Sequence, residues 1–174
     1  TSSASYCTAM GYATTASGST STAMGVNTTA SGDGSTSLGN QTTASANNSI
    51  ATGASTTASG EVSTAMGYAT TANGSSSTSM GLSTTANGDV SIAMGLGTTA
   101  NGNVSVAMGR NTTASDYGSL VIGQYNYSGS AITTSSTAFN TSNTAFVIGN
   151  GTSGSLSDAF KVMFNGDTSV TVSY

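Results

Sequence analysis

The sequence contains no histidine, no proline and no tryptophan, and its single cysteine is Cys7. One cysteine excludes a disulfide framework within the chain, and a metal site built from His and Cys is not expected. Proline cannot donate a backbone hydrogen bond, so its absence suits a chain made of short parallel strands. The composition therefore predicts no cofactor, and Cys7 is interpreted as a small packing residue.

Charge is scarce as well: charged residues make up 5% of the 174 residues, and the formal net charge is −4. A typical globular domain is about 25% charged, so the surface is expected to consist mainly of Ser, Thr, Asn and Gly. Nucleic-acid binding needs clustered Lys and Arg, so no nucleic-acid partner is expected. No signal peptide or membrane span is visible, and we expect no membrane contact by this segment.

The acidic residues do not form pairs along the chain. Asp33, Glu61, Asp89 and Asp116 are spread at about one per two repeats, in segments typical of turns. General acid–base catalysis needs carboxylates or other titratable groups brought together. We interpret these acids as solvated turn residues, and no enzymatic activity is expected.

What the chain does contain is a repeat of fourteen residues, marked by glycine. The first glycine series comprises Gly11, Gly25, Gly39, Gly53, Gly67, Gly81, Gly95, Gly109 and Gly123. A second series follows seven residues later and is interrupted at Ala46 and Asp116. A fixed period with small residues at fixed positions indicates one structural unit stacked on itself. The sequence predicts an all-β parallel solenoid, in which each coil has two short strands and two turns.

One coil is illustrated by residues 63–76, with Ser63 as position one. Positions one, three and five, represented by Ser63, Ala65 and Gly67, are small in every coil up to the last, where position three is Val121. Because alternate residues of a strand face opposite sides, these positions are predicted to line a narrow interior. Positions two and four then face outward.

The outward positions of this first strand are largely apolar. Since stacked coils repeat every ~4.8 Å, they form a stripe of roughly 40 Å, which a soluble protein is not expected to leave in water. The alternative places the Met column inside a monomeric roll. We predict that the stripe is a homotrimer interface formed by Met10, Met24, Leu38, Ile50, Met66, Met80, Ile92, Met94, Val106, Met108, Leu120 and Ile122.

The second strand of each coil carries two adjacent threonines. The first, such as Thr70, is predicted to face inward, where nearby turn backbone would supply hydrogen-bond partners to its hydroxyl. The second is predicted to face outward, beside a column of Ser and Asn. The candidate outward binding ladder is Thr15, Thr29, Thr43, Thr57, Thr71, Thr85, Thr99 and Thr113.

The pattern Ser-Thr-Ala-Met-Gly-x-x-Thr-Thr-Ala-Ser/Asn-Gly, over about residues 5–128, resembles the head repeat of trimeric autotransporter adhesins, the YadA-like head. Similar repeats occur in bacteriophage tail-fibre proteins. The resemblance implies a left-handed parallel β-roll and three rolls around an axis faced by the aliphatic positions. It also implies an extracellular location, on a bacterial surface or a virion fibre. This chain departs from the pattern by having Thr and Met where Val and Ile are usual.

The last fifty residues break the period. We predict a repeat roll of about nine coils over residues 1–128 and an irregular C-terminal cap over residues 129–174. The segments around Phe146 and Phe160 resemble those that follow such repeats in phage fibre and surface proteins. Residues 160–164 followed by Asn165-Gly166-Asp167 predict a hairpin. Because the chain begins in mid-pattern, we expect it to be part of a longer protein.

Three functions are compatible with these patterns. The first is a structural and adhesive trimer that presents its Thr/Ser/Asn surface to a host glycan or protein. The second is a monomeric ice-binding solenoid that uses the outward Thr ladder, although only one threonine of each pair faces out. The third is a passive spacer within a phage fibre, with no ligand of its own.

Overall fold

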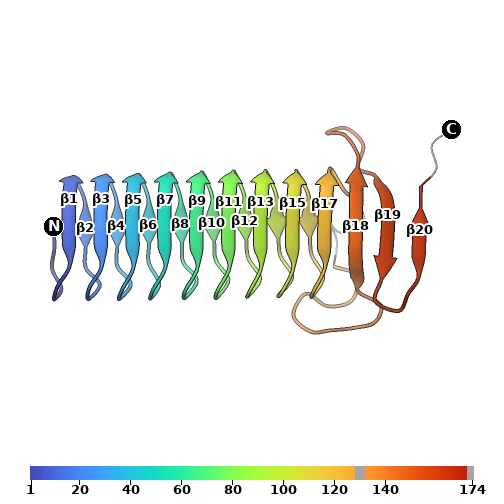
Figure 1. Ribbon diagram of the computed structural model, residues 1–174, viewed down its shortest axis with the longest axis horizontal. Helices are drawn as coiled ribbons and strands as arrows, with labels where there is room; N and C mark the ends of the chain where they lie inside the picture. Colours follow the sequence, from blue (N-terminus) through green and yellow to red (C-terminus); the bar gives the residue numbers. More distant parts are fainter. Residues whose placement is uncertain (128–131, 172–174) are drawn as a thin grey trace.

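The computed structural model describes residues 1–127 and 132–171, which form a β-solenoid closed at one end by a cap (Figure 1). Within these residues the strands form a twelve-stranded and an eight-stranded sheet. The twelve-stranded sheet contains β1 (Thr8–Tyr12), β3 (Thr22–Val26), β5 (Thr36–Asn40), β7 (Ile50–Ala54), β9 (Thr64–Tyr68), β11 (Thr78–Leu82), β13 (Ile92–Leu96), β15 (Val106–Arg110), β17 (Leu120–Gln124), β18 (Thr144–Asn150), β19 (Asp158–Met163) and β20 (Thr168–Val170). The eight-stranded sheet contains β2 (Thr15–Ala16), β4 (Thr29–Ala30), β6 (Thr43–Ala44), β8 (Thr57–Ala58), β10 (Thr71–Ala72), β12 (Thr85–Ala86), β14 (Thr99–Ala100) and β16 (Thr113–Ala114). Among the described residues, no helix has the length and apolarity needed to cross a bilayer.

Each coil lies directly on the next, with equivalent residues in register. Met80 is paired with Met94 in the twelve-stranded sheet, and Thr85 with Thr99 in the eight-stranded sheet, both between parallel strands. Each strand therefore receives its backbone hydrogen bonds from coils fourteen residues away. The predicted parallel solenoid of fourteen-residue coils is confirmed.

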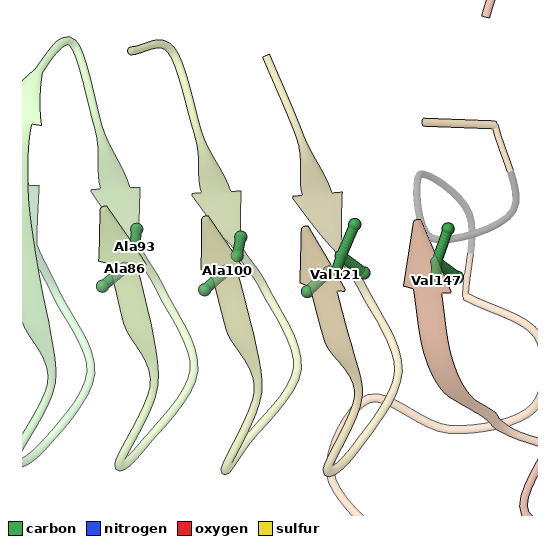
Figure 2. Close-up of a cluster of buried hydrophobic side chains, with 7 residues drawn as sticks. Ala86, Ala93, Ala100, Val121 and Val147 are labelled. Carbon is green, nitrogen blue, oxygen red and sulfur yellow. The ribbon is translucent and has the colours of Figure 1, made fainter. Parts of the chain in front are cut away.

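The core between the two sheets consists of alanine rather than of large side chains. Ala86 and Ala100 from the eight-stranded sheet and Ala93 from the twelve-stranded sheet have no exposed surface and belong to one buried cluster (Figure 2). Toward the cap, Val121 and Val147 extend this core, and both are fully buried. An interior filled by methyl groups leaves no volume for Met, so the alternative with Met inside a monomeric roll is wrong.

The first glycine series does not line the interior, which corrects the sequence-based assignment of position five. Gly11, Gly39 and Gly53 are exposed. Gly67 has φ +129°, a conformation that side chains strongly disfavour, and a Cβ there would overlap the backbone carbonyl of Gly81 in the next coil. Glycine is therefore required by the close approach of successive coils.

The inward threonines do not receive the turn-backbone partners that the sequence led us to expect. Their side-chain oxygens are buried without a hydrogen-bond partner among the described residues at Thr28, Thr56, Thr70, Thr98 and Thr112. Partners occur where a serine stands at position three. In those coils the hydroxyl of Ser37 contacts that of Thr42, and the hydroxyl of Ser79 contacts that of Thr84, each at 2.7 Å.

The cap joins the sheet of the roll directly. Strand β18 pairs in parallel with β17, and β19 and β20 then follow in antiparallel order (Figure 1). The eight-stranded sheet ends instead at the side chain of Asn126. Its Oδ1 accepts the Thr113 N–H at 2.8 Å, and its Nδ2 donates to the Thr113 carbonyl at 3.0 Å. One buried amide thus replaces the next strand.

Asp116 fastens the cap to the last coil. It stands in the second glycine series, is 1% exposed, and accepts the backbone N–H of Thr133 and of Thr144 at 2.6 and 2.8 Å. The interpretation of Asp116 as a solvated turn residue is wrong, because its carboxylate satisfies two donors that the cap brings to it.

Candidate interaction surfaces

The outer face of the twelve-stranded sheet carries the apolar residues of positions two and four. Met10, Met66 and Met108 are 55%, 41% and 39% exposed. Ile50, Ile92 and Leu120 are also exposed, whereas Met24, Leu38, Met80, Met94, Val106 and Ile122 are half-buried. The structure thus places all twelve predicted residues on this one outer face.

Strand pairing brings these side chains into continuous columns. Met10 is opposite Met24, and Met66, Met80, Met94 and Met108 follow one another in consecutive coils. Parallel neighbours stack at ~4.8 Å, so each Met side chain covers its neighbour and leaves one flank in solvent. The column is interrupted at Thr52, which is paired with Met66.

A third outward column was not anticipated from the sequence. Each long strand continues one residue past its glycine, and the alternation then turns that residue outward. Five apolar members are exposed, namely Tyr12 (75%), Val26 (40%), Tyr68 (58%), Leu82 (43%) and Leu96 (37%). Extending the alternation one step past the glycine would have found this column, which widens the apolar face.

The outer face of the eight-stranded sheet has the opposite chemistry. All eight threonines of the predicted ladder are half-buried there, and their pairing is in register from Thr15 to Thr113. Beside them runs a chain of side-chain hydrogen bonds. Asn73 Nδ2 donates to Asn87 Oδ1, and Asn87 Nδ2 donates to Asn101 Oδ1, each at 2.8 Å. This face is uncharged and regularly hydrogen-bonded.

The acids at the turns hold coils together. Asp33 Oδ1 accepts the Ser19 N–H at 2.8 Å, and Asp89 Oδ1 accepts the Ser75 N–H at 2.9 Å, in each case from the preceding coil. Within the described residues, no three His, Cys, Asp or Glu side chains come together as metal ligands would. The Cys7 thiol contacts the Ala4 carbonyl at 2.9 Å and packs beside the first alanines of the core.

The repeat is similar to that of a known protein family. A family model described as YadA head domain repeat (2 copies) matches residues 8–28, 30–56, 58–84, 72–98, 86–109 and 100–126. These matches cover the stacked coils and end before the cap. No curated protein matches the chain.

Proposed function

The chain belongs to the YadA head domain repeat family, a family of structural surface adhesins, and from this premise we propose that it is a homotrimeric fibre segment. Its repeat roll and the cap that follows it together form a rigid rod outside the cell, on a bacterial surface or a virion fibre. Three copies join through the outer face of the twelve-stranded sheet. The Thr/Ser/Asn face of each copy is then presented to a host glycan or protein, or to another surface.

The single observation that carries this proposal is the opposite chemistry of the two outer faces. One face carries columns of Met, Ile, Val and Leu in which Thr takes six of the places, and the other carries in-register Thr with Ser and Asn and no apolar column. An apolar face of this length is unlike the surface of a soluble monomer. The alanine core cannot take it in, so a second surface has to cover it, and a closed homo-oligomer is the commonest solution.

Adhesion through the polar face would rest on repetition. Each coil offers one outward threonine hydroxyl, and three copies multiply the same weak contact. Linked weak contacts gain affinity through effective concentration, without a deep pocket. The long uncharged ladder supports a neutral, hydroxyl-rich or amide-rich contact surface.

The first test is the mass in solution by light scattering on a sizing column. We expect a mass near three times 16.8 kDa for the wild type. The double variant Met66→Asp, Met80→Asp should dissociate, because it places like charges in a desolvated contact. The matched control, Thr71→Asp with Thr85→Asp, alters the same two coils on the opposite face and should keep the oligomeric mass. A wild-type mass of 16.8 kDa would refute the assembly.

The second test addresses adhesion. Binding of the intact fragment to host cells or to a glycan array should be lost in the Thr71→Asp, Thr85→Asp variant and kept in Thr64→Ser, which changes the other face. If the wild-type fragment binds nothing, the chain is a passive spacer and the adhesive part of the proposal fails.

Ice binding is a second candidate, favoured by the regular register of the outward ladder. Thr71, Thr85 and Thr99 repeat at one coil spacing on a face without charge. A freezing-point measurement decides between the two functions. Thermal hysteresis that disappears in the Thr71→Asp, Thr85→Asp variant would support ice binding, and its absence in the wild type would exclude it.

A further inference from the structure

The apolar face of the twelve-stranded sheet does not end with the repeat. In the parallel pairing of β17 with β18, Leu120 is opposite Phe146 and Ile122 is opposite Ile148. Residues opposite each other in a sheet project on the same face. Two of the outward columns of the roll therefore continue into the cap.

The antiparallel strands carry these columns further. Val162 is opposite Phe146, and Phe160 is opposite Ile148 and, on its other side, Val170. We call the set Phe146, Ile148, Phe160, Val162 and Val170 the cap patch. The Phe146 and Phe160 rings meet edge to face with centroids 6.0 Å apart. The patch is thus one continuous aromatic and aliphatic surface.

The intervening residues show that the cap patch faces outward. Val147, between Phe146 and Ile148, is fully buried in the core that Figure 2 shows. Lys161 is opposite Val147 and Ser169, so its side chain is on that other face. The members of the cap patch are half-buried, except Val170, which is 64% exposed. Within the described residues, nothing covers them completely.

The apolar character of the face increases toward the cap. The position-two column is Thr in the first three coils (Thr8, Thr22 and Thr36) and mixed in the middle coils (Ile50, Thr64 and Thr78). In the last coils and β18 it is apolar throughout, with Ile92, Val106, Leu120 and Phe146. The position-four column is mainly Met, whose flexible side chain loses more conformational entropy on burial than Ile or Leu. Phenylalanine gives a larger and stiffer contact area. The strongest apolar contact available to a partner is therefore at the cap.

We infer that the cap patch is the tightest part of the contact between copies of this chain, and that its occupant is the cap of a second copy. The inference rests on the proposed function, because the columns that would meet at the roll lead directly into the patch. A copy seated along these columns brings its own cap beside the patch. The family match ends at residue 126, so the repeat pattern itself does not account for this surface.

The test compares two neighbouring substitutions on one exposed strand. Val170→Glu places a charge on the cap patch, whereas Ser169→Glu places the same charge on the other face of β20, opposite Lys161, where it is tolerated. Sedimentation velocity over a dilution series should show at least a tenfold weaker association for Val170→Glu and no change for Ser169→Glu. Phe160→Ser should weaken association further, with circular dichroism confirming the fold.

Comparison with the Met66→Asp, Met80→Asp variant separates the two claims. If that variant dissociates while folded Val170→Glu and Phe160→Ser associate as tightly as wild type, the cap inference is overturned and the proposed assembly stands. If the cap variants dissociate and the Met variant does not, the cap inference is supported and the contact along the roll fails. A wild type that is monomeric at every concentration overturns both, and a partner of another kind would then have to cover the patch.

Discussion

The hydroxyl of Ser79 lies 2.7 Å from the hydroxyl of Thr84 inside the roll, and the same pair recurs between Ser37 and Thr42. In both coils serine replaces the alanine of position three. Where alanine is kept, as at Ala65, the inward threonine of the coil, here Thr70, has no partner among the described residues. One side-chain oxygen at position three therefore decides whether the buried threonine is satisfied.

We predict that Ala65→Ser stabilises the roll. The added hydroxyl would pair with Thr70, and one buried hydrogen bond is worth about 1 kcal/mol. The reciprocal change, Ser79→Ala, should cost a similar amount by leaving Thr84 unpaired. Urea unfolding monitored by circular dichroism measures both free energies. A lower unfolding free energy for Ala65→Ser would contradict the hydroxyl pairing as its cause.

Gly67→Ala should destabilise the roll strongly. The new Cβ would overlap the Gly81 carbonyl, and the backbone at φ +129° disfavours a side chain, so we expect a loss on the order of 3 kcal/mol. Gly154→Ala is the control, because a Cβ there meets nothing within 4 Å. The unfolding free energy of this variant should equal that of the wild type. Equal melting temperatures for the two variants would show that neighbouring coils can move apart at Gly67 without loss of folding free energy.

Asp116→Gly should release the cap while leaving the coils intact. The substitution restores the glycine of the repeat but removes the acceptor of two N–H groups, that of buried Thr144 and that of exposed Thr133. Leaving the buried Thr144 N–H unpaired should cost about 1–3 kcal/mol. Hydrogen exchange at these two amides should accelerate, whereas the amides of β9 keep their protection. As a control, Asp33→Asn should change little, since Asn47 already performs the same role one coil further on. Unchanged exchange at Thr133 and Thr144 would contradict the role of Asp116.

Val90→Asn should stabilise the corner of the roll. Val90 has φ 57° and is 55% exposed, and Asn48 occupies the same position of an earlier coil with φ 55°. A β-branched residue is strained in this left-handed conformation, which Asn tolerates. We therefore expect the unfolding free energy of Val90→Asn to rise by about 1 kcal/mol. The reverse substitution, Asn48→Val, should lower the melting temperature. Calorimetry measures the melting temperature of both variants. A higher melting temperature for Asn48→Val would rule out backbone strain as the cause.

Much of the candidate surface followed from local rules. Alternation along a strand places Ala65 inside and Met66 outside whatever the rest of the chain does, and the fixed period aligns Met66 with Met80. The third column, which includes Tyr68, was not predicted because faces are assigned from the sequence only for positions one to five, the last of which is Gly67. Strand length is decided by pairing with neighbouring coils, which lets β9 continue to Tyr68.

The cap could not be derived in this way. The pairing of Leu120 with Phe146 joins segments separated by a long connection without a repeat, and nothing local sets that register. The buried roles of Asp116 and Asn126 depend on donors and acceptors of distant residues. Each looks like an ordinary polar turn residue in the sequence.

The sequence by itself determined the parallel solenoid, the alanine core and the outward columns of Met and Thr, because a short period and strand alternation act locally and repeat in every coil. Only the tertiary structure decided why position five is glycine, how the eight-stranded sheet is closed and that the apolar face continues into the cap. These features arise where backbone from one coil or segment approaches another, and that approach is fixed by packing and hydrogen bonding between residues far apart in the chain.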